Sequence, residues 1–555
     1  MKVLICALNT KYVHSSLAPW YLKAAVEKYS SNSVCDVYES TINEDEEKII
    51  KHLLEAEADM IGFSAYIWNI GKLISISKRI KKQKKVKIFF GGPEVSYNAK
   101  EVLEKNPHID FIISGEGEEP LAKVCDNVSY RDIEGLCYRD GDNVMEKEPY
   151  ISKKDPPCPY TEEYFKALNG RISYIETSRG CPYRCAFCLS GRCGGVRFFD
   201  IEEAKRNILL LANSGSKTVK FIDRTFNADK KRAKEILSFI IDNYGKNIPG
   251  SVCFHFEIEG EIIDDETVEI LSKAPVGSIQ VEIGLQSFNE KTLNHINRKT
   301  NLAKLTENIK KLVSLENIHI HVDLIAGLPY EDIVSFGESF NKALALNPHM
   351  LQFGFLKLLH GADMREDKER YCCEYSKEPP YEVLSTPHLT NDDLNTMHLI
   401  EDVFDKIYNS GRFVRTAKYI AQKSEDPFKT YTGFAEFMKN HKNDTSLDAF
   451  TLCMLEYFST LDFLSSDILR DCMALDRLSS NRMGMLPEFL KYRGADIKKA
   501  LSFLESNEST KRRQGIKRAA TFLKTENVFA YVDYDCKNPV TDQYEIKYLR
   551  ENNIF

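Results

Sequence analysis

Four cysteines lie within the thirteen residues from Cys181 to Cys193, and their spacing favours a metal centre. Cys181, Cys185 and Cys188 follow the pattern C-x3-C-x2-C, so their thiolates can converge on one centre from a single loop. Thiolates suit iron–sulfur clusters or zinc. A closed structural zinc site needs four ligands, so three cysteines leave one coordination position open for a substrate or cofactor. Cys193 as a fourth ligand would close the site, and this alternative stays open.

The sequence around this motif alternates apolar strands with helix-length stretches. Within residues 171–365 there are six strand candidates: RISYIETS, KTVKFIDRTFN, SVCFHFEIEG, SIQVEIGLQS, IHIHVDLIAGLP and MLQFGFLKLL. Repeated strand–helix units predict a partial or full parallel (β/α) barrel. Barrels of this kind carry their functional groups at the carboxyl ends of the strands. We therefore expect the active site at that end.

The two flanking regions have different patterns. Residues 1–130 contain continuous apolar strands separated by helical stretches, which predicts a doubly wound parallel sheet with its ligand site at the strand carboxyl ends. Residues 131–170 are predicted to be a linker centred on the proline-rich run KKDPPCPY. Residues 366–555 are predicted to be mainly helical, with β-like pieces near the end. The expected fold class is therefore α/β with a mainly α C-terminal region.

The composition is that of an ordinary globular protein, with 43% hydrophobic and 28% charged residues among 555 and a net charge of −7. A mildly acidic chain argues against strong binding to nucleic acid, which requires a basic surface. No apolar stretch approaches the roughly 20 residues of a membrane span, and the N-terminus is too short in its apolar part for a signal peptide. We therefore expect a cytoplasmic protein whose fifteen cysteines are mostly free thiols or metal ligands.

The run CPYRCAFC resembles the cluster motif of the radical S-adenosylmethionine (SAM) superfamily, with Phe187 at its aromatic position. The resemblance implies a [4Fe–4S] cluster held by Cys181, Cys185 and Cys188, whose open iron binds the amino and carboxylate groups of SAM. One electron from a reductant such as flavodoxin or ferredoxin then cleaves SAM to a 5′-deoxyadenosyl radical. That radical removes a hydrogen atom from the substrate. The partial barrel of this superfamily matches the strand pattern above.

Further runs are similar to SAM-binding motifs of the same superfamily. HFEIEG, VEIGLQSF and INRK imply that Glu257, Gln286 and Arg298 contact the ribose or methionine part of SAM. The chemistry agrees, because an arginine binds a carboxylate bidentately and Glu or Gln can bind hydroxyls or an ammonium. The run IAGLP, which starts at Ile325, resembles the later Gly-Leu-Pro turn, where backbone groups meet the adenine.

Residues 1–130 resemble the cobalamin-binding domain that precedes many radical SAM barrels, through the runs FFGGPEV and IISGEGEEPL. The cobalamin motif Asp-x-His-x-x-Gly is absent, because Asn9 and Lys11 stand where its Asp and His are expected and His14 comes too late. Two interpretations stay open. Either the domain binds cobalamin, or it is a shell that lines a substrate pocket, and the missing motif favours the second. The pocket residues would then be Tyr66, Trp68 and Glu94.

The arrangement of the whole chain resembles a group of radical SAM proteins with a cobalamin-like domain, a barrel and a helical C-terminal region. This resemblance implies a lyase that cleaves queuine, a modified deazaguanine base, to its aminomethyl-deazaguanine precursor in queuosine salvage. The expected partner is therefore a small molecule, with a modified nucleobase favoured. Two alternatives stay open: a cobalamin-dependent radical SAM methyltransferase or cyclase, and a non-catalytic iron–sulfur or zinc protein.

Several groups at the barrel strand ends are suited to a guanine-like base. A carboxylate can accept hydrogen bonds from the ring N–H and exocyclic amine of such a base, and Arg or Lys can bind its carbonyl. The candidate substrate-binding residues of the barrel are Arg224, Glu282, Asp323 and Lys357. The candidate catalytic residues are His255 and Asp223. An imidazole changes its charge near neutral pH, so His255 is suited to move a proton.

Overall fold

The structure is a computed structural model that describes the chain except for residues 440, 442–445, 481–485, 493–495, 508–509, 511–514 and 551–555. The chain divides into two compact units. Unit 1 comprises Met1–Glu259, Ile296–Arg298 and Leu356–Leu384. Unit 2 comprises Gly260–His295, Lys299–Phe355 and Ser385–Phe555. The predicted barrel, residues 171–365, thus contributes to both units.

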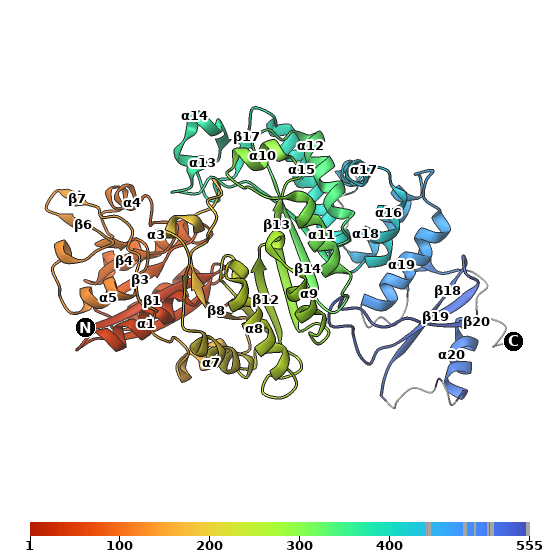
Figure 1. Cartoon of the computed structure of the whole chain (residues 1–555), viewed down its shortest axis with the longest axis horizontal. Coiled ribbons are helices and arrows are strands. Elements are labelled where there is room, and N and C mark those ends of the chain that lie inside the picture. Colours follow the sequence, from red (N-terminus) through yellow and green to blue (C-terminus); the bar gives the residue numbers. More distant parts are fainter. Residues whose placement is uncertain are drawn as a thin grey trace. The chain divides into compact units, whose positions relative to one another are not determined.

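A seven-stranded sheet forms the N-terminal part of unit 1, in the order β2-β1-β3-β4-β5-β6-β7 (Figure 1). Its strands are β1 (Lys2–Asn9), β2 (Val34–Thr41), β3 (Met60–Ser64), β4 (Lys87–Gly91), β5 (Phe111–Ile113), β6 (Leu136–Asp140) and β7 (Asn143–Met145). The first five strands pair in parallel. The predicted doubly wound sheet is therefore confirmed, with β2 as an edge strand that the sequence pattern did not indicate.

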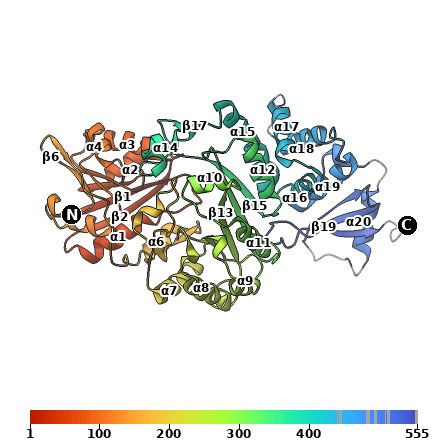
Figure 2. The same ribbon diagram turned by 45° about the horizontal axis from the view of Figure 1, so that its top comes forward.

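Helices cover both faces of this sheet (Figure 2). They are α1 (Ala18–Tyr29), α2 (Glu46–Glu55), α3 (Ile70–Gln83), α4 (Ala99–Lys105) and α5 (Glu118–Cys125). Leu4, Cys6 and Leu8 of β1 pack in one core with α2, α3 and α4, whereas Val3 and Ile5 pack with α1 and α5. Successive side chains of a strand point to opposite faces, so a strand covered on both sides is apolar throughout. Because the two faces are covered, the strand ends are the part of this sheet that can bind a ligand.

Part of the stretch expected as a linker forms regular structure. β6 and β7 pair antiparallel with each other, and β6 pairs antiparallel with β5, so this hairpin extends the sheet. The hairpin turns at Asp140-Gly141-Asp142, where Gly141 has a φ of 60°. Aspartate followed by glycine is a frequent hairpin turn because glycine accepts positive φ. Helix α6 (Glu162–Leu168) follows before the barrel begins.

The central part of the chain alternates strands with helices, as predicted. In unit 1, β8 (Ser173–Ile175), β11 (Thr218–Phe221) and β12 (Cys253–Ile258) pair in parallel. In unit 2, β13 (Ile279–Gln286), β14 (His319–Ala326) and β15 (Met350–Phe355) pair in parallel. The intervening helices are α7 (Ile201–Ala212), α8 (Lys230–Asn243), α9 (Asp265–Ser272), α10 (Glu290–His295), α11 (Leu302–Val313) and α12 (Ile333–Leu344).

The C-terminal region of unit 2 is mainly helical, as predicted, and ends in a small sheet (Figure 1). Its helices are α15 (Asn391–Phe404), α16 (Val414–Lys423), α17 (Pro427–Lys439), α18 (Leu447–Phe458), α19 (Ser466–Ser480) and α20 (Ile497–Ser506). The antiparallel strands are β18 (Arg518–Leu523), β19 (Val528–Asp533) and β20 (Lys547–Arg550). Across the residues that the structure describes, no helix has the length and apolar character needed to span a membrane.

Candidate active site

The cysteine loop of unit 1 runs between two short strands, β9 (Ser178–Arg179) and β10 (Arg197–Phe198), which pair antiparallel. The loop is held from two sides, because the Ala186 N–H donates to the Ile296 carbonyl and the Ala186 carbonyl accepts from the Met364 N–H. At its start Gly180 has a φ of 94°, and a Cβ there would collide with the Gly195 carbonyl. Only glycine tolerates both this positive φ and the close approach of the Gly195 carbonyl. The start of the loop therefore requires glycine at position 180.

The three predicted cluster ligands share one environment within this loop. The Arg298 guanidinium donates to Cys185 Sγ at 3.7 Å, and the Ser190 N–H donates to Cys188 Sγ at 3.4 Å. Cys181 Sγ lies 3.2 Å from the hydroxyl oxygen of Thr225. Burial raises the pKa of the Cys185 thiol, the Arg298 charge lowers it, and charge on Cys188 and Cys181 raises it again. The three thiols therefore lie close enough to interact.

Cys193 lies in a different environment. Its side chain is exposed and forms part of a cavity wall. The charged groups that act on it are Glu116, Arg179, Arg197 and Glu176. This placement favours three protein ligands over four.

Arg298 forms a buried ion pair beside the cysteine loop. Its guanidinium donates to Glu259 Oε2 at 3.0 Å, and the two residues are 9% and 6% exposed. Glu257, the acidic residue chosen from the sequence, instead faces Lys220 at 3.9 Å and Arg224 at 3.7 Å. Glu259, which lies just after the end of β12, was not predicted from the sequence.

Asp223 holds the segment that leads into the cysteine loop. Its carboxylate accepts hydrogen bonds from the Thr177 N–H at 3.0 Å, the Thr177 hydroxyl at 2.7 Å and the Ser178 hydroxyl at 2.5 Å. Burial raises the pKa of Asp223, and these bonds lower it. The geometry therefore suits a positioning role better than the catalytic role expected from the sequence. His255, the other catalytic candidate, is buried on β12 and 7% exposed.

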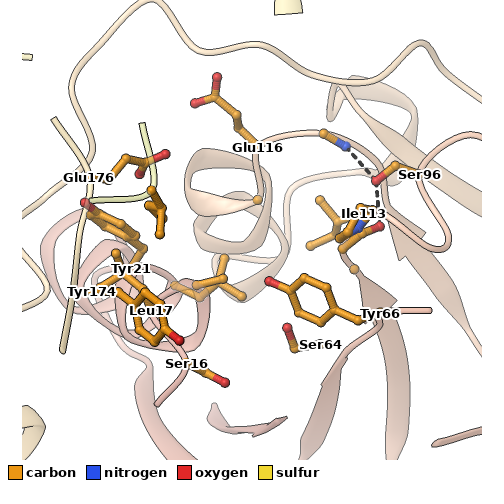
Figure 3. Close-up of a pocket in the computed structure, with 18 of the residues that line it drawn as sticks. Ser16, Leu17, Tyr21, Ser64, Tyr66, Ser96, Ile113, Glu116, Tyr174 and Glu176 are labelled. Atoms are coloured by element: carbon orange, nitrogen blue, oxygen red, sulfur yellow. Dashed lines mark hydrogen bonds between the residues drawn. The ribbon is translucent and has the colours of Figure 1, made fainter. Parts of the chain in front are cut away.

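A cavity of about 660 Å³ opens in unit 1 at the carboxyl ends of the N-terminal strands (Figure 3). Loops after β1, β3, β4 and β5 form one side of it, and residues from β8 to the β11 end form the other. Representative lining residues are His14, Tyr66, Gly92, Tyr174, Glu176 and Arg224. Gly92 has a φ of 115°, and a Cβ there would collide with the Ala65 carbonyl, so this turn also requires glycine.

Two predicted pocket residues form a stacked pair in this cavity wall. The rings of Tyr66 and Trp68 lie 4.4 Å apart at 8°, and the Trp68 indole N–H donates to the Leu8 carbonyl. Figure 3 shows the Tyr66 ring directed toward the cavity. Glu94, the third predicted pocket residue, contacts Tyr381, whose hydroxyl donates a hydrogen bond to the Glu94 carboxylate. Burial raises the pKa of Glu94. Lys357 is exposed, and its backbone bridges to Glu382.

Arg179 joins the cavity rim of the N-terminal sheet to the entrance of the cysteine loop. Its guanidinium contacts three carboxylates, Glu116 at 2.6 Å, Glu118 at 2.6 Å and Glu176 at 3.0 Å. Arg197 makes a second ion pair with Glu116 at 2.8 Å. This network was not predictable from the sequence, because Glu116 and Glu118 lie 63 and 61 residues from Arg179.

Unit 2 has a polar cluster of its own on the neighbouring strands β13 and β14. The His321 Nε2 atom lies 2.9 Å from Asp323 Oδ1, and its Nδ1 atom lies 3.9 Å from Glu282 Oε2. Glu282 and His321 are paired in register, which brings them side by side. Glu282 and Asp323 were predicted from the sequence as candidate site residues, whereas His321 was not. The remaining expected residues of this unit are Gln286, which ends β13 with a φ of 72°, and Ile325, which follows Asp323 on the same face.

Glu331 is a buried carboxyl group just after the Gly-Leu-Pro turn. Its Oε1 atom accepts hydrogen bonds from the hydroxyls of Ser287 at 2.7 Å and Ser339 at 3.1 Å. Its side chain is 0% exposed, and burial raises its pKa to about 7. Because Ser287 directly follows Gln286, this carboxyl group ties the end of β13 to the turn after β14.

We expect Glu331→Gln to remove a pH dependence of unfolding. The pKa of Glu331 is raised from 4.5 to about 7 in the folded state. The stability that the protonated carboxyl group contributes is therefore fully present below the unfolded-state pKa and is lost as the pH rises to the folded-state pKa. The loss is about 3 kcal/mol at about 1.4 kcal/mol per pKa unit. The variant cannot ionise, so its melting temperature should exceed the wild type near pH 8 and match it near pH 5. Parallel profiles in circular dichroism would refute this assignment.

Comparisons with known proteins match the three regions separately. Residues 3–125 match the B12 binding domain, and residues 175–343 match the radical SAM superfamily. Residues 369–548 match a family described as a protein of unknown function, DUF4080. Together with the fold, these matches give an N-terminal B12-binding domain, a central radical SAM domain with a parallel sheet, and a helical C-terminal region.

The curated relatives and solved structures that resemble the chain include the following three. A 2-(S-pantetheinyl)-carbapenam-3-carboxylate methyltransferase from Streptantibioticus cattleyicolor is 24% identical over 54% of this chain and 47% of its own. The cobalamin-dependent radical SAM methyltransferase TokK from Streptomyces tokunonensis is 26% identical over 53% of this chain and 46% of its own length. One similar solved structure is that of OxsB, a cobalamin-dependent SAM radical enzyme with aqua-cobalamin and SAM bound. It matches with a TM-score of 0.59 at 14% identity, over 85% of this chain and 78% of the OxsB chain. The chain spans about half the length of these curated relatives.

These findings correct two expectations. Queuine lyase was the particular protein suggested by the whole-chain likeness, and the comparisons do not support it, since the two curated relatives described above are named methyltransferases. The missing Asp-x-His-x-x-Gly motif argued against a cobalamin role, yet residues 3–125 match the B12 binding domain despite its absence. That motif is therefore a poor guide to this domain.

Proposed function

We propose that this protein is a cobalamin-dependent radical SAM methyltransferase that acts on a small molecule. The observation that carries the proposal is the shared cavity of unit 1. One wall is formed by the strand ends of the B12-binding sheet, and the other includes Tyr174, Glu176 and Arg224 from the start of the radical SAM domain. A cofactor of the first domain and chemistry of the second can meet in this space.

The cysteine loop fits an iron–sulfur cluster with one open iron. Three thiols from one loop are suitable ligands, and the Arg298 guanidinium and the Ser190 N–H donate to two of the sulfurs. Hydrogen bonds of this kind orient metal ligands and tune the metal. When bound, the cluster supplies one electron for the cleavage of SAM. Phe187, Glu257, Gln286 and Ile325 are proposed to contact SAM, and the electron donor is proposed to be a flavodoxin or ferredoxin.

The cavity also fits a large, partly apolar cofactor. Its walls combine aromatic and aliphatic side chains with a few polar groups, as ligand sites usually do. The positive φ of Gly92 lets the backbone after β4 form part of the wall. When bound, cobalamin supplies a carrier for a methyl group, and the residues of this chain hold it and exclude water.

A decisive experiment measures both products of SAM with and without added cobalamin. Anaerobically reconstituted protein is incubated with SAM and a reductant, and S-adenosylhomocysteine and 5′-deoxyadenosine are quantified. We expect S-adenosylhomocysteine to form only when cobalamin is present, because S-adenosylhomocysteine is what remains of SAM once its methyl group has been transferred. Formation of 5′-deoxyadenosine at the same rate with and without cobalamin, and no S-adenosylhomocysteine, would overturn the proposal.

A further inference from the structure

Three side chains on the neighbouring strands β13 and β14 of unit 2 bring metal-ligating atoms together. They are Glu282, His321 and Asp323, and one nitrogen or oxygen atom of each lies within 4.8 Å of the others. Two ligands that are each held about 2.1 Å from one ion lie about 3–4 Å apart. A small rotation of the Glu282 side chain would therefore let all three side chains bind the same ion.

The strand pattern places these three polar groups on one face of the sheet. Every second side chain of β13 is apolar and buried, namely Val281, Ile283 and Leu285. Successive side chains of a strand point to opposite faces, so Glu282 lies on the face opposite to these three. His321 pairs in register with Glu282, and Asp323 follows His321 by two residues on the same face. The ligand atoms are thus carried by two paired strands, and strands position a site more precisely than loops do.

His321 is the most buried member of the group. Its side chain is 8% exposed, whereas those of Glu282 and Asp323 are each 24% exposed. The His321 Nε2 atom lies 2.9 Å from Asp323 Oδ1, a contact with the distance of a hydrogen bond but without its direction. A hydrogen bond therefore does not account for this approach, whereas two ligands of one ion are held at such a distance. Two partly buried carboxylates beside an imidazole also favour a cation between them.

We propose that Glu282, His321 and Asp323 bind one divalent ion of the first transition series. Imidazole nitrogen suits zinc and iron, carboxylate oxygen suits manganese, and this ligand set combines the two without sulfur. An ion with three protein ligands keeps a position for a water molecule or for an oxygen atom of a substrate. The site is a second metal centre, separate in sequence from the cysteine loop. The assignment does not depend on the proposed methyltransferase function, because the bound ion is detected directly.

The test uses Mn²⁺ as the probe, because carboxylate ligands suit this ion better than the thiolates of the cysteine loop do. Full-length protein is reconstituted anaerobically with iron and sulfide, freed of excess metal and titrated with Mn²⁺, whose sharp EPR signal in water is lost on binding. We expect one tightly bound Mn²⁺ per chain. Glu282→Gln, His321→Gln and Asp323→Asn should each weaken binding by more than about 100-fold, since loss of an outer partner of a ligand already costs about 10–100-fold. His388→Gln, which replaces an exposed histidine of the same unit, should bind Mn²⁺ as the wild type does.

A second readout identifies the histidine ligand. In protein that carries ¹⁵N in histidine alone, pulsed EPR of the bound Mn²⁺ should show a nitrogen coupling that differs from that of unlabelled protein. The coupling should be lost in His321→Gln and kept in His388→Gln. Far-UV circular dichroism checks the fold of each variant, and the isosteric Glu282→Gln and Asp323→Asn provide the test if His321→Gln does not fold.

Three results would each overturn the assignment. The first is a wild-type chain that retains no Mn²⁺, and the second is equal binding by the wild type and both acid variants, which is the behaviour of surface carboxylates. The third is a spectrum that the histidine label does not change. None of these results affects the products formed from SAM, so failure of this assignment and failure of the proposed function are distinguishable.

Discussion

Replacement of Cys181, Cys185 or Cys188 by alanine is expected to abolish iron binding and 5′-deoxyadenosine formation, whereas Cys193→Ala should keep both. The three thiols lie together in one loop and act on one another electrostatically. Cys193 instead lies with Glu116, Arg179 and Arg197 in the cavity wall. Loss of an outer partner of a metal ligand typically costs 10–100-fold, so loss of a ligand itself should cost more than about 100-fold.

The measurement is iron and sulfide content together with 5′-deoxyadenosine after anaerobic reconstitution. Cys193→Ala is the matched control, because it removes a thiol from the same loop without changing the proposed ligand set. If Cys193→Ala lost iron as completely as the other three variants, the site would have four ligands and no open iron. Retention of iron in Cys185→Ala would equally contradict the assignment.

Replacement of Arg179 by methionine is expected to destabilise unit 1 by about 3–5 kcal/mol, the usual cost of breaking a buried ion pair by removing one partner. The Arg179 side chain is 16% exposed, and its partners Glu116, Glu118 and Glu176 are 11–14% exposed. Glu116 keeps Arg197, but Glu118 and Glu176 lose their nearest cation. Burial raises the pKa of Glu118, and the charge and hydrogen bond of Arg179, together with a backbone hydrogen bond and Arg197, lower it below its usual value, so this pKa should rise in the variant.

Denaturant unfolding followed by tryptophan fluorescence measures this effect in unit 1 alone, since Trp20 and Trp68 are the two tryptophans of the chain. Arg192→Met is the matched control. Arg192 forms an exposed ion pair with Asp363, with 38% and 51% of the side chains exposed, so its loss should cost less than about 1 kcal/mol. Equal shifts of the two variants would show that the Arg179 network contributes no more than a surface pair.

The sequence predicted those elements whose burial leaves a clear pattern. β1, β3 and β4 are apolar between their end residues because helices cover both faces of the sheet. β2 was missed because it is an edge strand whose side chains are mostly half-buried or exposed. β7 was missed because it has only three residues, and β6 because it ends in the polar residues Arg139 and Asp140, which interrupt its apolar pattern.

The candidate site was predictable where chemistry lies within one short run, as for Cys181, Cys185 and Cys188. It was not predictable where the partners meet only in the folded chain. Glu259 and Arg298 are separated by 39 residues, and Arg179 and Glu116 by 63. His14 was not chosen because its spacing does not fit the cobalamin motif, whereas the fold places it in the cavity wall.

The most direct test of the central claim, a cluster with one iron free of cysteine, is the EPR spectrum of the reduced protein before and after SAM is added. We predict about four iron and four sulfide per chain, and a spectrum that changes when SAM binds to the open iron. Zinc in place of iron, or a cluster spectrum unchanged by excess SAM, would contradict the account.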